Sequence, residues 1–309
     1  MNQIICIAGP TASGKTALAV ELAKAVNAEV VSCDSMQVYK RMDIGTAKPT
    51  EEEMDGIVHH MLSVAEPDED FSVSRYCEMA TPIVDNIVSR GKTAIIAGGT
   101  GLYMDALIRG NSFAPYPSTG RRQALEEQAE KDGIESVLCQ LKEVDPDSAA
   151  RLHPSDRKRI IRALEVYQET GKTITQHNRE TQLLPPRYTP VWFAIEDTDR
   201  QQLYRRIDER VLQMLDDGLL DEIRSLLASG VPEKATAMQA IGYKEFVDAL
   251  MGRSDLDAAV AQVQQASRHY AKRQLTWFRR NPAIHWLRRG PGQPEILSAA
   301  RQILLDSDI

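Results

Sequence analysis

The sequence predicts an α/β fold in which a parallel sheet is flanked by helices and interrupted by a helical insertion domain. Three observations support this prediction. Short apolar runs alternate with helical patterns in the first third of the chain, a glycine-rich loop follows the first of these runs, and a long central stretch is helical with little strand character. Buried strands that alternate with helices are typical of a parallel sheet with helices on both faces.

The strands are expected at short apolar, β-branched runs. Residues 3–8 predict the first buried strand, and residues 17–26 predict a helix because their apolar side chains recur on one face. Residues 29–33 and 93–97 predict the second and third strands. In sheets of this kind the ligand binds at the carboxyl ends of the strands. Functional residues are therefore expected directly after these runs.

The character of the chain changes near residue 112, where prolines mark a linker before a helical stretch. A second group of prolines ends this stretch. We expect residues 112–188 to form a helical insertion domain, and residues 1–111 and 189–309 to form the core. The remaining elements expected in the core are a strand at 191–195, helices over 200–280 and a last strand at 285–287.

The bulk composition is that of a packed cytoplasmic protein. Hydrophobic residues make up 42% and charged residues 26% of the 309 residues, which supports a packed core. No apolar run approaches the roughly 18 to 20 residues needed to cross a bilayer. The first residues carry no basic leader, so we expect no membrane association and a cytoplasmic location. The four cysteines form no CxxC pair, which suits free thiols and excludes a multi-cysteine zinc finger.

Charge is unevenly distributed along this acidic chain. The net charge is −7, but no Asp or Glu occurs between residues 258 and 294. That stretch, the C-terminal basic run, contains Arg268, Lys272, Arg273, Arg279, Arg280, Arg288 and Arg289. A second basic cluster consists of Arg151, Arg157, Lys158, Arg159 and Arg162. Each run could be a solvated helix face, but two such runs on an acidic chain keep RNA binding open.

A phosphate-binding loop lies between the first predicted strand and the first predicted helix. It matches the pattern GxxxxGK[ST] and consists of Gly9, Pro10, Thr11, Ala12, Ser13, Gly14, Lys15 and Thr16. The backbone amides of such a loop and the following helix N-terminus bind a di- or triphosphate. Lys15 adds a full positive charge, and Thr16 offers a hydroxyl to Mg²⁺. The sheet is therefore expected to be of the P-loop type, although the motif does not identify the phosphate compound.

Two further turns follow predicted strands. Asp34 stands just past the second strand, where it could hold Mg²⁺, orient an acceptor or cap a helix. We favour catalysis, because the strand order would place Asp34 beside the P-loop. Thr100 lies in the turn Gly98–Gly101, whose glycines allow close approach of the backbone to a ligand.

Two arginines have alternative interpretations. Arg206 and Arg210 are four residues apart and so share one helix face. They could neutralise charge on a departing diphosphate. The sequence alone favours the alternative that they pair with Asp208, Glu209 or their neighbours.

The chain resembles the tRNA dimethylallyltransferase family, also called tRNA isopentenyltransferase, in its bacterial form. The resemblance covers nearly the whole chain. Besides the P-loop, its motifs are Asp34–Tyr39, Met42–Pro49, Gly98–Tyr103, Arg159–Glu165, Ile241–Glu245 and Tyr270–Arg279.

The resemblance implies a reaction. The dimethylallyl group of dimethylallyl diphosphate would be transferred to N6 of the adenosine 3′-adjacent to the anticodon, in tRNAs that read codons beginning with U. The P-loop would hold the diphosphate with Mg²⁺, and Asp34 would be the general base. Thr100 and Arg210 would stabilise the transition state or the leaving group. The insertion domain would grip the anticodon stem.

The same resemblance implies contacts with the tRNA anticodon stem-loop. The residues expected to make them are Asp34, Ser35, Met36, Gln37, Thr100, Arg122, Lys158, Arg159, Ile160, Ile161 and Arg162. The C-terminal basic run adds Lys272 and Arg273. Besides tRNA, dimethylallyl diphosphate is the expected partner, and we expect a monomer.

Three other functions fit parts of the sequence. A small-molecule P-loop kinase would use ATP, with Arg121 and Arg122 of the insertion in a lid. An adenylate dimethylallyltransferase would make a free prenylated nucleotide, but it would not need two basic runs. A non-catalytic RNA-binding NTPase module would not need Asp34. Release of intact diphosphate from an allylic substrate would support transfer to tRNA over the kinase alternative.

Overall fold

Residues 4–110 and 119–306 of this computed structural model are described here. The chain divides into two compact units, which are treated separately. The core unit comprises Met1–Gly110 and Arg187–Ile309, and the insertion unit comprises Asn111–Pro186. The chain thus returns to the core unit at Arg187, two residues before the expected position.

The core unit is built on a parallel sheet. In the described residues its strand order is β3-β2-β4-β1-β5-β6, and every pairing is parallel. The strands are β1 (Ile4–Ala8), β2 (Ala28–Ser32), β3 (His59–His60), β4 (Thr93–Ala97), β5 (Val191–Asp197) and β6 (Ile284–Arg289). The five expected strands are confirmed within two residues at each end. The two-residue strand β3 was not expected, because so short a segment has no recognisable periodicity.

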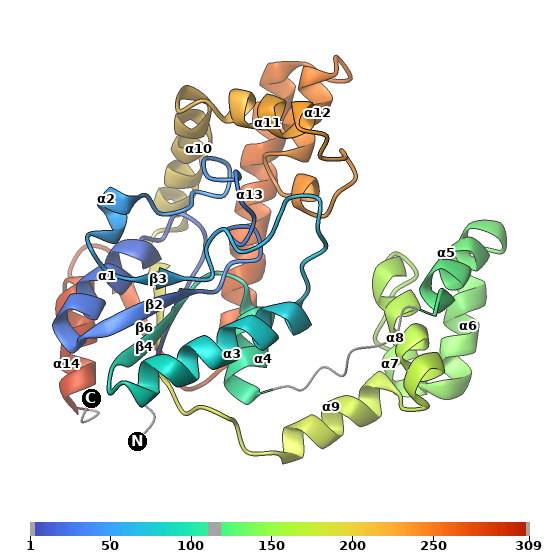
Figure 1. The fold of residues 1–309 in the computed structure, drawn as a ribbon, viewed down its shortest axis with the longest axis horizontal. Helices are drawn as coiled ribbons and strands as arrows, with labels where there is room; N and C mark the ends of the chain where they lie inside the picture. The colour runs from blue at the N-terminus through green and yellow to red at the C-terminus, as the bar shows by residue number, and fades with distance from the viewer. Residues whose placement is uncertain (1–3, 111–118, 307–309) are drawn as a thin grey trace. The chain divides into compact units, whose positions relative to one another are not determined.

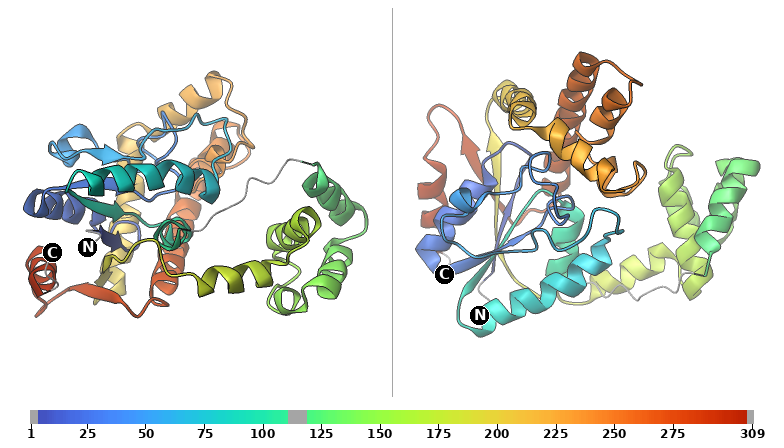
Figure 2. Two further views of the ribbon diagram at one scale, coloured as in Figure 1. Left: turned by 60° about the horizontal axis from the view of Figure 1, so that its bottom comes forward. Right: turned by 45° about the horizontal axis from the view of Figure 1, so that its top comes forward.

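Helices cover both faces of this sheet (Figure 1). Their bounds are α1 (Lys15–Val26), α2 (Glu51–Met54), α3 (Val73–Ser89), α4 (Gly101–Arg109), α10 (Arg200–Asp216), α11 (Leu219–Ala228), the 3-10 helix η1 (Ala237–Gln239), α12 (Lys244–Leu250), α13 (Leu256–Phe278) and α14 (Ile296–Asp306). On one face, Leu18 and Leu22 of α1 and Leu304 of α14 pack against Ile5 and Ile7 of β1. Helix α3 contacts β2 and β4 and packs against α4 (Figure 2).

The sheet brings three loops together at its carboxyl edge. Strand β1 lies between β4 and β5, and β4 pairs with both β1 and β2. The Gly98 N–H donates to the Ile7 carbonyl at 3.1 Å, and the Cys33 N–H donates to the Ala97 carbonyl at 2.8 Å. A side chain at Gly98 would collide with the Cys33 carbonyl. The segments after β1, β2 and β4 are therefore neighbours, as the sequence predicted.

The insertion unit is helical and has a core of its own. Its helices are α5 (Arg121–Lys131), α6 (Ile134–Val144), α7 (Pro146–Ala149), α8 (Arg157–Thr170) and α9 (Ile174–Leu183). Ile160 and Ile161 of α8 pack with Leu125 of α5 and with Val137 and Leu141 of α6. This unit therefore buries apolar side chains between its own helices.

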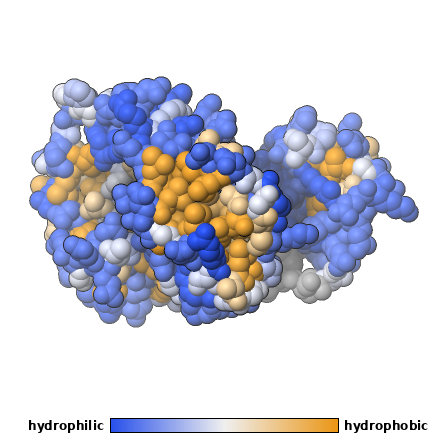
Figure 3. All heavy atoms as spheres, turned by 90° about the horizontal axis from the view of Figure 1, so that it is seen from above, coloured by the Kyte–Doolittle hydropathy of each residue, from blue (hydrophilic) through white to orange (hydrophobic). Residues whose placement is uncertain are grey.

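The surface of the core unit is mixed. Figure 3 views the side that carries α10, α11 and α12, where apolar residues gather among hydrophilic ones. Leu212 of α10 and Met251, just after α12, are about half exposed. Within the described ranges, no helix has both the length and the apolar character needed to span a membrane.

We expect Ile160→Ala to destabilise the insertion unit by about 2–5 kcal/mol, the usual cost of truncating a fully buried isoleucine. Ile160 is 0% exposed. Hydrogen exchange of the α6 and α8 amides in the full-length chain would measure the change. Arg159→Ala, next to it with a side chain 76% exposed, should leave exchange almost unchanged. Equal effects of the two substitutions would contradict the packing described here.

Candidate active site

The P-loop, Gly9–Thr16, curls tightly between β1 and α1. Gly14 has a φ of 84° and Ala12 a φ of 59°, both in the left-handed region. The Lys15 side chain folds back over the loop, and its Nζ donates to the Pro10 carbonyl at 2.7 Å. Burial, together with the nearby Arg210 charge, lowers the pKa of Lys15 to about 8, while Asp34 opposes the shift. Lys15, Arg210 and Asp34 therefore lie within electrostatic reach of one another.

Gln274 of α13 ties the P-loop to the turn after β4. Its Oε1 accepts from the Thr11 N–H at 2.9 Å, and its Nε2 donates to the Gly99 carbonyl at 3.0 Å. The Gln274 side chain is buried, so these bonds are shielded from water. Sequence reasoning did not assign a role to Gln274, because its two partners are far away in the chain.

Arg206 and Arg210 of α10 both reach the P-loop. Arg210 Nη1 lies 3.4 Å from Thr11 Oγ1. Arg206 Nε donates to the Ala12 carbonyl at 3.2 Å, and its Nη2 donates to Asp197 at 2.5 Å. The interpretation that Arg206 pairs with its helix neighbours is wrong. Burial lowers the pKa of Arg210, and the charge of Asp34 partly compensates.

Asp34 begins the loop after β2 and is half-buried. Its Oδ1 accepts from the Met36 N–H at 2.9 Å and lies 3.4 Å from the Gln37 N. This oxygen therefore caps the turn that follows. No hydrogen bond to Asp34 Oδ2 is formed within residues 4–110 and 119–306. One carboxylate oxygen thus orients the side chain, and the other makes no hydrogen bond with the described residues.

Thr100 connects the turn after β4 to the Asp34 loop. Its Oγ1 accepts from the Ser35 N–H at 3.0 Å, and its own N–H donates to the Cys33 carbonyl at 3.2 Å. The structure therefore brings Thr100 and Asp34 to one place, beside the P-loop, as the sequence predicted.

Tyr270 is a site residue that sequence reasoning missed. Burial, together with the Asp34 charge, raises the pKa of Tyr270 to about 12, while Thr100 opposes the shift. The Arg273 guanidinium lies 5.5 Å from the centre of the Tyr270 ring. Tyr270 and Gln274 share one face of α13, because they are four residues apart. That spacing of an aromatic and an amide within a basic stretch was the signal available in the sequence.

The segment after Asp34 is held by side-chain hydrogen bonds. Gln37 Nε2 donates to the Ala47 carbonyl at 3.0 Å, and Gln37 Oε1 accepts from Ser32 Oγ at 3.0 Å. The Glu222 carboxylate of α11 accepts from the N–H groups of Asp43 and Ile44 at 2.7 and 2.8 Å. The side chains of Ser35 and Met36 are half-buried. The Gln37 amide, expected to contact tRNA, is thus already used within the protein.

The residues expected to contact tRNA from the insertion unit fall into two groups. Arg122, Lys158 and Arg159 are exposed, and Arg162 lies 2.9 Å from Glu165. Ile160 and Ile161 are 0% and 2% exposed. Helix α8 turns the side chains of these two isoleucines into the core of the unit and presents the neighbouring cations to solvent, so their side chains are not available to tRNA.

Part of the C-terminal basic run is paired with acids. Arg268 forms an ion pair with Asp208. Arg279 and Arg288 lie 3.3 and 3.1 Å from Glu196. In contrast, Lys272 and Arg273 are exposed on α13 and form no ion pair within the described ranges.

Mg²⁺ fits this site as a companion of a bound diphosphate. Among the described residues, no group of three His, Cys, Asp or Glu side chains could hold a metal ion. Mg²⁺ is usually held by few protein oxygens together with phosphate oxygens and water. Thr16, in the first turn of α1, offers such an oxygen.

Comparisons with known proteins agree with this geometry. A family model described as IPP transferase matches residues 37–281. The chain is 46% identical over 290 residues to a tRNA dimethylallyltransferase of Acetivibrio thermocellus, a match that covers 94% of this chain and 92% of the relative. It is 46% identical over 293 residues to a tRNA dimethylallyltransferase of Oceanobacillus iheyensis, covering 93% and 91%.

Solved structures are also similar. The crystal structure of a full-length tRNA isopentenylpyrophosphate transferase from Bacillus halodurans has a TM-score of 0.74 and 38% identity, covering 100% of this chain and 96% of that chain. A eukaryotic dimethylallyltransferase described as acting on tRNA has a TM-score of 0.83 and 29% identity, covering 100% and 79%. The chain therefore belongs to the IPP transferase family, in which these curated relatives are tRNA dimethylallyltransferases.

Proposed function

We propose that this chain transfers the dimethylallyl group of dimethylallyl diphosphate to N6 of the adenosine 3′-adjacent to the anticodon, in tRNAs that read codons beginning with U. One observation carries the proposal. A carboxylate, Asp34, stands at the carboxyl edge of the sheet beside a phosphate-binding loop that contains Lys15 and is contacted by Arg210. Family membership supports the same reaction.

The diphosphate is the leaving group. The bond between the allylic carbon and the diphosphate oxygen breaks, and both electrons leave with the diphosphate. An allylic cation is delocalised, so stabilising the departing charge is the protein's main task. The P-loop amides, Lys15 and Arg210 would supply that stabilisation, and Mg²⁺ held by Thr16 and the diphosphate would neutralise further charge.

The acceptor is an exocyclic amine, which is a poor nucleophile. As the new bond between N6 and the allylic carbon forms, Asp34 would accept the N6 proton. Met36 N–H and Gln37 N–H hold one Asp34 oxygen, so the other would face the amine. Thr100, bonded to the Ser35 N–H, would hold the same loop against the leaving group. The adenine would leave the anticodon loop to reach Asp34.

The tRNA would be bound mainly through its phosphates. Exposed cations are available on both units, Lys272 and Arg273 on α13 and Arg122, Lys158 and Arg159 on the insertion helices. Ser35 and Met36 would lie near the target base. Cys6, Cys33 and Cys77 are free and buried, which suits a reducing cytoplasm. A monomer is proposed, because one chain supplies every group named in this mechanism.

The assay that tests the proposal mixes unmodified tRNA, labelled dimethylallyl diphosphate and Mg²⁺. Label should appear in tRNA, and intact diphosphate should be released. Transfer of the γ-phosphate of ATP to a small acceptor would support a kinase instead. Labelling of free adenylate but not of tRNA would support an adenylate dimethylallyltransferase.

We expect Asp34→Asn to lower single-turnover transfer by roughly 10²- to 10⁴-fold, the range for general acid–base catalysis. Asparagine keeps an oxygen that can accept from the Met36 N–H, so the turn should stay intact. Affinities for tRNA and for dimethylallyl diphosphate should change little. Near-normal transfer by the folded variant would remove the general-base role, and recovery of the rate at high Mg²⁺ would assign Asp34 to the metal.

Binding of dimethylallyl diphosphate should depend on the charge of Lys15. Its pKa is about 8 in the free protein, so the ammonium form that attracts the diphosphate is present below that pH and is lost as the pH rises through it. Above that pH, Lys15 must therefore take up a proton when the diphosphate binds to its charged form. Calorimetry without tRNA, in buffers with different ionisation heats, should show this uptake growing between about pH 7.5 and 9. Lys15→Met should abolish it, and a wild-type protein that takes up no proton would contradict the assignment.

The exposed cations on α13 should set part of the salt dependence of tRNA binding. Replacing both Lys272 and Arg273 by alanine should flatten the slope of log affinity against log salt by about one to two units, at roughly 0.7–0.9 per phosphate contact. The double replacement of Arg279 and Arg288, which share Glu196, is the matched control and should have a smaller effect. An unchanged slope in the double variant would show that Lys272 and Arg273 do not contact tRNA phosphates and are only a solvated helix face.

A further inference from the structure

The outer side of the P-loop is held by two arginines from distant parts of the chain. A loop whose N–H groups point inward at a phosphate turns carbonyls outward. The outward carbonyl of Ala12 accepts from Arg206 Nε at 3.2 Å. The next carbonyl, of Ser13, accepts from Arg289 Nη2 at 2.8 Å. Arg206 lies on α10 and Arg289 is the last residue of β6.

The Asp197 carboxylate lies between these arginines. Asp197 is the last residue of β5, and its side chain is 1% exposed. One oxygen accepts from Arg206 Nη2 at 2.5 Å, and the other lies 4.0 Å from Arg289 Nη1. The Thr198 N–H also donates to the Arg289 carbonyl at 2.9 Å, which fixes the end of β6 beside the end of β5. A single buried acid thus hydrogen-bonds Arg206 and lies at ion-pair distance from Arg289.

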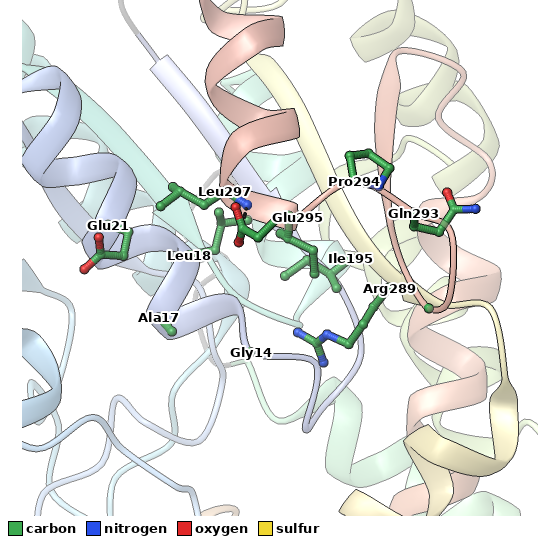
Figure 4. Close-up of a pocket in the computed structure, with 12 residues that line it drawn as sticks. Gly14, Ala17, Leu18, Glu21, Ile195, Arg289, Gln293, Pro294, Glu295 and Leu297 are labelled. Carbon is green, nitrogen blue, oxygen red and sulfur yellow. Dashed lines mark hydrogen bonds between the residues drawn. The ribbon is translucent and has the colours of Figure 1, made fainter.

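Ala12 also packs against Leu203 and Ile207 of α10, whereas an open space lies beside Gly14. A cavity of about 420 Å³ lies there, bordered by Gly14, Leu18, Ile195, Arg289, Pro294 and Leu297. Figure 4 shows Arg289 reaching from the end of β6 toward the loop at Gly14. A side-chain carbon at Gly14 would lie 3.0 Å from Arg289 Nη2. Beside Gly14 the loop is therefore held by the hydrogen bond from Arg289 to the Ser13 carbonyl.

We propose that Asp197, Arg206 and Arg289 form an outer clamp that keeps the P-loop in its phosphate-binding conformation. These three are positioning residues, because they act on the diphosphate through the backbone of Ala12 and Ser13. Arg289, a member of the C-terminal basic run, therefore serves the diphosphate site and not the tRNA surface. This inference rests on the proposed diphosphate site.

The substitution Asp197→Asn distinguishes two hypotheses, a clamp that positions the loop and simple charge attraction by the arginines, because they predict opposite changes in diphosphate affinity. If the arginines acted only as positive charges near the diphosphate, removing the acid would strengthen diphosphate binding. If they position the loop, binding should weaken, since an asparagine NH₂ would face an arginine donor and the guanidinium groups would lose their orientation. We expect the Kd of inorganic diphosphate with Mg²⁺, measured by calorimetry on the full chain, to rise about tenfold, which is about 1.4 kcal/mol. An unchanged or lower Kd would overturn the clamp.

Arg289→Gln gives an independent test and decides the question if Asp197→Asn does not fold. It should raise the Kd of diphosphate by about tenfold or more, as expected for losing a charge-assisted hydrogen bond. The tRNA affinity and its salt slope should stay unchanged. Arg288→Gln, the neighbouring residue that pairs with Glu196, is the matched control and should leave the diphosphate Kd as in the wild type.

The outcomes distinguish the two proposals. A wild-type chain that binds no diphosphate would refute the proposed function itself. A wild-type chain that binds diphosphate, with Arg289→Gln binding equally well, would refute only the clamp. A loss of tRNA affinity in Arg289→Gln, with unchanged diphosphate binding, would refute the clamp and show that Arg289 contributes to tRNA binding.

Discussion

A phosphate-binding loop can point its N–H groups at a ligand only if its other polar groups are satisfied from outside. In this chain that constraint shapes much of the core unit. Gln274 accepts a hydrogen bond from the Thr11 N–H. Arg206 and Arg289 donate to the carbonyls of Ala12 and Ser13. These partners come from α13, α10 and β6, so three distant elements must be in place before the loop has its shape. A buried polar group left without a partner costs about 1–3 kcal/mol, which makes these contacts a condition of the fold as well as of binding.

The reacting groups are gathered by the parallel sheet. Because β2 and β4 are neighbours, the turn that carries Thr100 lies against the loop that begins at Asp34. Close approach here requires glycine, since a side chain at Gly98 would meet the Cys33 carbonyl. Gln274 then bridges the turn after β4 to the P-loop. The separation between the carboxylate and the phosphate cradle is thus fixed by the pairing of the strands together with the side-chain hydrogen bonds of Thr100 and Gln274.

The C-terminal basic run does not form a continuous cationic surface in the folded protein. An acidic protein with a basic run suggests a continuous cationic surface, but Glu196 and Asp208 pair with three of the arginines in that run. Another, Arg289, turns inward to the P-loop. Three exposed cations of the run, Lys272 and Arg273 on α13 and Arg280 just after it, form no ion pair within the described ranges and are left for a polyanion. Paired cations are partly neutralised, so the electrostatic attraction to nucleic acid depends on fewer residues than the sequence suggests.

The sequence by itself determined the strands of the core, the P-loop, the helical insertion and the meeting of Asp34 with Thr100, because apolar periodicity and glycine requirements act over a few residues. It did not reveal Gln274, Tyr270 or Asp197 as parts of the site, nor that the side chains of Ile160 and Ile161 form a core. It also favoured pairing of Arg206 with its helix neighbours, whereas Arg206 contacts the P-loop and Asp197. Only the tertiary structure decided these points, because the direction of a side chain and the partner of a charge depend on elements that are far apart in the chain and meet only after folding.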